Sequence, residues 1–156
     1  MTTKQSLFLV ALTAASALML GGALGFQYLG YAPCKMCYWQ RYPHAVAIVL
    51  GIFALMLGHR LWYFAGALAL ATTSGIGFFH AGVELGFWPG PSSCTGNGAG
   101  LTGLSGDALL SVENVPAIVM CDQVSWAFMG LSMAMWNGLI SAGLALAWLW
   151  MAVAKR

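Results

Sequence analysis

Segment 7–30 reads LFLVALTAASALMLGGALGFQYLG and contains no Lys, Arg, Asp or Glu. A bilayer core of about 30 Å requires roughly 20 helical residues to cross it, and this segment is long enough. Backbone groups inside lipid must form their hydrogen bonds within the segment, so the segment must be helical. We therefore predict a first transmembrane α-helix over residues 7–30.

Three further apolar segments have the length of a span, at about 40–57, 61–85 and 126–153. Across the chain 60% of the residues are hydrophobic and 6% are charged, whereas about 25% are charged in an average soluble domain. So few charges cannot cover a water-soluble surface. We predict an all-α membrane protein, a single domain over residues 1–156 that forms a four-transmembrane-helix bundle.

The first segment also has the general form of a secretory signal peptide, since Lys4 precedes an apolar run. The apolar region of a signal peptide is usually about 7–15 residues long. Segment 7–30 is longer, so we expect an uncleaved helix that stays in the mature protein.

Cationic residues are divided unequally between the two ends of the predicted bundle. An even number of spans places both termini on one side of the membrane, and Lys and Arg accumulate in cytoplasmic connections. The side of the termini carries the larger set, which is Lys4, Arg60, Lys155 and Arg156, against Lys35 and Arg41. We therefore predict cytoplasmic termini, with the connections at about 31–42 and 87–125 on the opposite side.

All four cysteines fall in these two outer connections, at Cys34, Cys37, Cys94 and Cys121. An even number of cysteines on the oxidising side of a membrane predicts disulfides. A tetrahedral zinc site is the rival use of four cysteines, but zinc ribbons usually contain two Cys-x-x-Cys units and this chain has one. We therefore expect no metal, and a net charge of +2 gives no basic patch for nucleic acid.

Cys34 and Cys37 form a Cys-x-x-Cys motif at the start of the second predicted helix. Residues three apart in a helix are about one turn apart, which puts their Cα atoms at roughly 5 Å, within the range of a disulfide. Such a bond closes almost no loop, so the motif favours redox chemistry over a structural role. Arg41 lies one turn after Cys37 on the same face, where a cation stabilises a thiolate. A membrane anchor is the alternative interpretation of Arg41.

Cys94 and Cys121 both lie in the long connection, which is rich in Gly, Pro and Ser around Cys94. By spacing alone, a disulfide between them would be a structural tether worth roughly 3–4 kcal/mol in the chain-entropy model. Between the two cysteines, the residues from about Ser105 to Glu113 predict a short amphipathic helix that rests on the membrane surface.

Three sequence motifs surround these cysteines. They are Pro33-Cys34-Lys35-Met36-Cys37 with Trp39-Gln40-Arg41-Tyr42, then Gly86-Phe87-Trp88-Pro89-Gly90-Pro91 with Cys94, and then Cys121-Asp122 with Trp126, Gly130-Leu131-Ser132-Met133 and Trp136-Asn137. As a set they resemble the family of disulfide bond formation protein B (DsbB). The resemblance covers nearly the whole chain, including the number of helices and the order of the loops.

The resemblance implies a multi-pass protein of the bacterial inner membrane, with its cysteines in the periplasm. It would oxidise a periplasmic dithiol partner of the DsbA type and pass two electrons to a membrane quinone, ubiquinone or menaquinone. Carried over by position, Cys34 and Cys37 match the pair nearest the quinone. Cys94 and Cys121 match the pair that exchanges with the partner, and Cys94 would form the mixed disulfide. Arg41 matches a family arginine that helps to bind quinone.

His80 and Glu84 are four residues apart near the outer end of the third predicted span. Ionisable residues within spans are functional hypotheses by default. Either the two side chains satisfy one another as a pair, or they act at the quinone, with His80 hydrogen-bonding or protonating one of its oxygens. His44, three residues after Arg41, is a weaker candidate for that role. Gln40 stands where some family members carry an acid, so an acid at that position is not essential here.

Two other functions compete with this oxidoreductase. A non-enzymatic membrane scaffold with structural disulfides would not explain a one-turn Cys-x-x-Cys motif beside an arginine. A conduit that carries reductant outward would require cysteines within the spans, and the predicted spans have none deep inside them.

Overall fold

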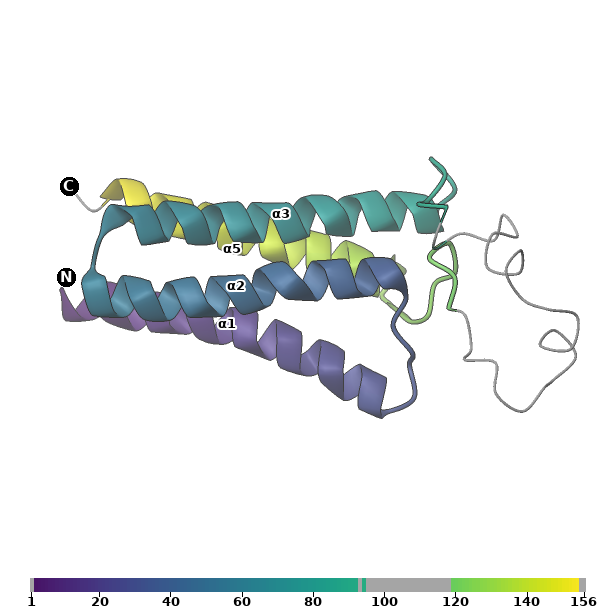
Figure 1. Cartoon of the computed structure of the whole chain (residues 1–156), viewed down its shortest axis with the longest axis horizontal. Coiled ribbons are helices and arrows are strands. Elements are labelled where there is room, and N and C mark those ends of the chain that lie inside the picture. Colours follow the sequence, from purple (N-terminus) through teal and green to yellow (C-terminus); the bar gives the residue numbers. More distant parts are fainter. Residues whose placement is uncertain (1, 93, 95–118, 155–156) are drawn as a thin grey trace, which may run out of the picture.

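The computed structural model describes residues 2–92, 94 and 119–154. Within them, four helices are long and apolar enough to cross a membrane, so the prediction of a four-helix membrane bundle is confirmed. They are α1 (Thr3–Tyr28), α2 (Lys35–Leu57), α3 (Arg60–Glu84) and α5 (Met133–Ala154) (Figure 1). The predicted amphipathic helix from Ser105 to Glu113 lies outside the described residues, as do Lys155 and Arg156.

Local signals set the ends of the first two helices. Thr2 forms a capping box with Gln5, in which each side chain bonds the other residue's backbone N–H. Cys34 is the N-cap of α2, and its sulfur accepts a hydrogen bond from the backbone N–H of Cys37 at 3.3 Å. Gly58 ends α2 in the left-handed conformation with φ of 62°. The second helix therefore begins at Lys35, earlier than the predicted boundary near residue 40, and Cys37 belongs to its first turn.

The last helix begins at Met133, later than the predicted boundary at Trp126, because a short hairpin precedes it. Strands β1 (Ala127–Phe128) and β2 (Leu131–Ser132) pair antiparallel. The two residues between the strands, Met129 and Gly130, both have positive φ, which is the geometry of a tight two-residue hairpin turn. These residues are mostly apolar, so hydropathy alone did not distinguish the hairpin from the helix.

The helices pack through small residues. In α3, a Cβ added to Gly77 would lie 2.8 Å from the backbone nitrogen of Gly138 and 2.9 Å from the carbonyl oxygen of Ala134, both in α5. At Gly66, a Cβ would collide with the indole ring of Trp148. Close backbone approach at small residues is the common way in which membrane helices associate.

The two ends of the bundle differ in character. Both termini lie at one end, where an apolar cluster includes Leu9, Tyr63 and Trp148 (Figure 1). At the other end, a second buried cluster contains three of the cysteines, packed with Met36 and Val83. The fold therefore collects the cysteines at the end of the bundle opposite the termini.

Candidate functional site

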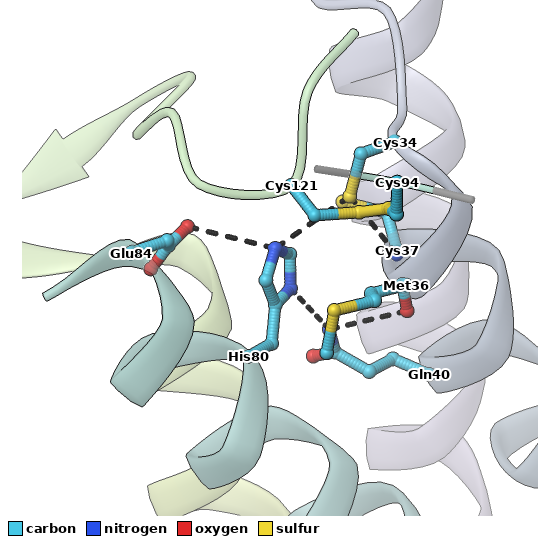
Figure 2. The surroundings of a disulfide bond; sticks show 8 residues. All are labelled: Cys34, Met36, Cys37, Gln40, His80, Glu84, Cys94 and Cys121. Atoms are coloured by element: carbon cyan, nitrogen blue, oxygen red, sulfur yellow. Dashed lines mark hydrogen bonds and ion pairs between the residues drawn. A yellow bond between two sulfur atoms is a disulfide. The ribbon is translucent and has the colours of Figure 1, made fainter. Parts of the chain in front are cut away.

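The four cysteines form one continuous group of sulfurs. Cys94 and Cys121 are joined by a disulfide, across a sequence separation of 27 and with their Cα atoms 5.3 Å apart. The sulfur of Cys34 lies within 4.8 Å of both sulfurs of that disulfide. It is also 3.0 Å from the sulfur of Cys37 (Figure 2). Cys34 therefore lies between Cys37 and the disulfide, at a distance that allows exchange after small movements.

Backbone contacts order the segment after α3 and join the two cysteines of the second pair. The backbone N–H of Cys94 donates to the carbonyl of Pro91 at 2.8 Å, and that of Cys121 donates to the carbonyl of Cys94 at 2.7 Å. Upstream, the indole N–H of Trp88 donates to the carbonyl of Phe79 at 2.8 Å, and the ring lies against the place where a Cβ of Gly82 would be. The chain that leaves α3 is thereby folded back against the last turns of that helix.

The Cys34 sulfur is in an environment that favours the thiolate. Its hydrogen bond with the Cys37 thiol is the largest influence and lowers the pKa of Cys34 to about 4. Burial opposes this shift, whereas the contact with His80 and the backbone N–H of Cys37 add to it. A sulfur at a helix N-terminus beside donors is the usual setting of a reactive cysteine. Cys34 is therefore ionised at neutral pH when its pair is reduced.

His80 of α3 contacts both the sulfur of Cys34 and polar side chains of α2 and α3. Its ring is 3% exposed, and its Nε2 atom lies 3.5 Å from the sulfur of Cys34 and 3.9 Å from Oε1 of Glu84. On the other side of the ring, Nδ1 lies 2.8 Å from Nε2 of Gln40 (Figure 2). The structure thus brings His80 and Glu84 together, as their spacing predicted, and places His80 beside the sulfur of Cys34.

Arg41 joins α2 to α1. Its guanidinium donates to Oε1 of Gln27 at 2.5 Å and to the carbonyl of Ala23 at 3.1 Å, and it lies 5.1 Å from the ring centroid of Tyr38. Two donations in different directions use the planar fork of arginine, which lysine lacks. The contacts hold the guanidinium at a fixed place near Cys37 without a direct bond to the sulfur.

A cavity of about 270 Å³ opens between α1, α2 and α5 next to these residues. Most of its walls are apolar and come from residues such as Leu18, Phe26, Trp136 and Ile140. The predicted site residues that line it are Cys34, Cys37, Arg41, His80 and Glu84. Cys94 and Cys121 do not line the cavity. Their disulfide lies next to Cys34, which does line it. An apolar space bordered by a few polar groups is the usual form of a small-molecule site.

Sequence reasoning missed part of the site. Gln40 and Asn137 join in a hydrogen bond of 2.7 Å, and Asn137 also bonds Nε2 of His44 at 2.9 Å and the hydroxyl of Thr73 at 3.1 Å. Polar side chains inside apolar spans were the available signal. It did not reveal which of them meet, because the partners come from three different helices.

The donor types also allow a metal. The sulfurs of Cys34 and Cys37 and a ring nitrogen of His80 lie within 4.8 Å of one another, and thiolate and imidazole are ligands that suit zinc. The sequence-based expectation that no metal is used stays a prediction.

Comparison with known proteins gives a consistent result. A family model described as "Disulfide bond formation protein DsbB" matches residues 4–151. Disulfide bond formation protein B of Azoarcus sp. is 29% identical, over 98% of this chain and 95% of its own length. The proteins of that name from Polaromonas sp. and Paracidovorax citrulli are each 32% identical, over 92% and 83% of this chain and 86% and 76% of their own lengths. No solved structure matches. On its helices, its cysteines and these matches, the chain belongs to the DsbB family of disulfide-forming membrane oxidoreductases.

Proposed function

We propose that this protein is a thiol:quinone oxidoreductase of the bacterial inner membrane. It oxidises a periplasmic dithiol partner of the DsbA type and passes the two electrons to a membrane quinone, ubiquinone or menaquinone. Both termini face the cytoplasm and the cysteines face the periplasm, in keeping with the distribution of Lys and Arg.

The single observation that carries the proposal is the position of Cys34 between Cys37 and the Cys94–Cys121 disulfide. Thiol–disulfide exchange proceeds by thiolate attack through mixed disulfides, so the sulfurs must be within reach of one another. A chain of adjacent sulfurs is what a two-step relay requires. A scaffold with separate structural disulfides has no need of it.

The first half of the relay oxidises the partner. A thiolate of the partner attacks the sulfur of Cys94, the Cys94–Cys121 bond breaks, and Cys121 leaves as a thiolate. The second thiol of the partner then attacks the mixed disulfide, so the partner departs as a disulfide and both loop cysteines are left reduced.

The second half moves the electrons inward. A thiolate of the loop pair attacks a disulfide between Cys34 and Cys37, and resolution of the mixed disulfide restores Cys94–Cys121 and leaves Cys34 and Cys37 reduced. The last step re-forms the Cys34–Cys37 bond and gives up two electrons and the proton of Cys37, because the proton of Cys34 has already left when its thiolate formed. A thiolate on Cys34 suits this step because it requires no prior deprotonation.

The cavity beside Cys37 fits a quinone, a flat apolar ring that supplies a two-electron, two-proton acceptor. Its walls are mostly apolar, whereas Arg41, His80 and Gln40 contribute polar groups. The fixed charge of Arg41 would stabilise negative charge on a carbonyl oxygen. His80, with Glu84 beside it, would hold or supply a proton near the same sulfurs.

The test is quinone-dependent oxidation of a reduced DsbA-like protein by the purified chain in lipid nanodiscs. We expect oxidation that requires both the chain and decylubiquinone or menadione. Cys94→Ser should abolish oxidation of the partner yet leave Cys34–Cys37 oxidisable by quinone, whereas Cys34→Ser should stop electron transfer out of the loop pair. Partner oxidation at the normal rate by Cys94→Ser would disprove the relay order. No quinone-dependent oxidation by the wild type would disprove the function and favour a scaffold.

A further inference from the structure

Polar groups face both nitrogens of the His80 ring (Figure 2). On the cysteine side, Nε2 lies 3.5 Å from the sulfur of Cys34 and 3.9 Å from Oε1 of Glu84. On the helix side, Nδ1 lies 2.8 Å from the amide of Gln40. A neutral imidazole carries one proton, so the atom that Gln40 presents to Nδ1 decides whether Nε2 offers a proton or a lone pair to the cysteines.

The hydroxyl of Thr73 determines how the Asn137 amide is oriented. It lies 2.9 Å from the backbone carbonyl of Gln40 and 3.1 Å from the amide of Asn137. A carbonyl only accepts hydrogen bonds, so the single proton of the hydroxyl goes to Gln40, and the hydroxyl must accept from Asn137. The atom of Asn137 that faces Thr73 is therefore the nitrogen, which also reaches the backbone carbonyl of Thr73 at 3.4 Å.

The orientation of the Gln40 amide follows from that of Asn137. The same nitrogen of Asn137 lies 2.7 Å from the Gln40 amide, which must present its oxygen there. The nitrogen of Gln40 then faces Nδ1 of His80, and it lies 3.3 Å from the backbone carbonyl of Met36. A reversed amide would place two donors together at Asn137 and two oxygens together at Met36. Nδ1 of His80 is therefore an acceptor, and the proton of the neutral ring is on Nε2.

A zinc ion at the cysteines would require the opposite arrangement. The sulfurs of Cys34 and Cys37 and a ring nitrogen of His80 lie within 4.8 Å of one another, and Glu84 would supply a fourth donor. The nitrogen on the cysteine side is Nε2, which would have to offer a lone pair. A metal-bound histidine almost always donates its other N–H to a carboxylate, a carbonyl or water. Here the group at Nδ1 is itself a donor, so metal binding would break the contact with Gln40.

We propose that Gln40 is a positioning residue that holds neutral His80 with its proton on Nε2, so that the cysteine pair has a hydrogen-bond donor beside it and does not take up a metal ion. Asn137 and Thr73 support this role, because they hold the Gln40 amide in one orientation. The proposal goes beyond the proposed function. Thiolates serve both as nucleophiles and as metal ligands, so a pair that held zinc through both sulfurs would be unavailable for exchange.

The first test is ¹⁵N NMR of histidine-labelled, oxidised protein in nanodiscs, at a pH above the ordinary histidine pKa of about 6.5. The chain has three histidines, and His80→Asn identifies the signals of this ring by their loss. We expect a protonated Nε2 and an unprotonated Nδ1 in the wild type. In Gln40→Glu the carboxylate accepts, so Nδ1 should become protonated. A protonated Nδ1 in the wild type would overturn the proposal, and so would an unprotonated Nδ1 in Gln40→Glu.

The second test measures the affinity for zinc by competition with a chromophoric chelator. The reduced protein carries Cys94→Ser and Cys121→Ser, so that only the first pair has thiols. Gln40→Glu supplies the carboxylate that a metal-bound histidine prefers, and it should tighten zinc binding by roughly ten- to a hundredfold. Adding His80→Asn should remove that gain, which a change in overall charge or stability would not explain.

The matched control is Gln27→Glu, which adds the same charge beside Arg41 and should not produce the gain. Unchanged zinc affinity in Gln40→Glu would overturn the proposal, as would a gain that survives His80→Asn or appears equally in Gln27→Glu. If Gln40→Glu does not fold, the tautomer of the wild type still decides the question. Neither measurement uses quinone or a partner, so a failure of the proposed function is detected separately, in the oxidation assay.

Discussion

At the residue scale, the sulfur of Cys34 combines three roles: it caps α2, contacts His80 and lies against the Cys94–Cys121 disulfide. A thiolate accepts hydrogen bonds more strongly than a thiol, so donors around this sulfur favour ionisation. The environment therefore prepares Cys34, the sulfur that contacts the loop pair, to exist as a thiolate whenever its pair is reduced.

The ionisation of Cys34 can be measured directly. In a variant with Cys94→Ser and Cys121→Ser, reduced and titrated with acid, the ultraviolet absorbance of one thiolate should persist at neutral pH. Because the pKa of Cys34 is lowered to about 4, the signal should disappear only as the pH falls through that value, well below the ordinary thiol value of about 8.5. Adding Cys34→Ser should abolish the signal. A midpoint near that of a free thiol would contradict the prediction.

Substitution of Arg41 tests whether its charge at the cavity serves catalysis or only anchors the helix in the membrane. Arg41→Met should lower kcat/KM for quinone by about ten- to a hundredfold, less than the loss of a fully buried oxyanion donor because the site is partly wet. Arg41→Lys should be intermediate, since one ammonium cannot reach both Gln27 and the Ala23 carbonyl.

The control for Arg41 is Arg60→Met. Arg60 also donates to a backbone carbonyl, that of Ala152 at 3.2 Å, but lies at the opposite end of the bundle. It should leave quinone kinetics unchanged. If Arg41→Met shows wild-type kinetics, Arg41 is a membrane anchor and the alternative interpretation is right.

At the element scale, α3 and α5 approach each other through their backbones, where Gly77 meets the backbone of Gly138 and Ala134. Gly77→Ala should destabilise the bundle by about 1–3 kcal/mol, because the new methyl group forces backbone apart. Gly75→Ala in the same helix is a matched control, since nothing lies within 4 Å of its Cβ, and it should stabilise the helix by up to about 1 kcal/mol. Thermal unfolding in detergent measures both. Equal melting temperatures would show that this contact does not limit the packing.

Some of the helices and side-chain contacts could be predicted from the sequence, and others could not. The four helices were predictable because a bilayer sets the length and polarity of a span. The pairing of His80 with Glu84 was predictable because residues four apart share a helix face. The contacts of Asn137 with Gln40 and His44 were not, since they depend on how helices far apart in sequence rotate against one another. The hairpin before α5 was missed because its turn depends on backbone conformation and not on hydropathy.

At the scale of the whole molecule, the cysteines and the termini lie at opposite ends of the bundle (Figure 1). Orientation can therefore be tested with one label at each end. In a cysteine-free background, Met129→Cys in the exposed hairpin turn should react with a membrane-impermeant maleimide in intact spheroplasts. His59→Cys, in the exposed turn at the other end, should react only after lysis. The reverse pattern would overturn the predicted orientation.

The cap of α2 has a consequence for the helix itself. The sulfur that accepts a hydrogen bond from the backbone N–H of Cys37 is the same atom that changes oxidation state in the proposed relay. As a thiolate it holds that amide with a full negative charge, and in a disulfide it holds it with a neutral atom. Hydrogen–deuterium exchange at the Cys37 amide should therefore be slower in the reduced protein than in the oxidised one. The exchange rate of one backbone amide would then report whether the Cys34–Cys37 pair is reduced or oxidised, without any added probe.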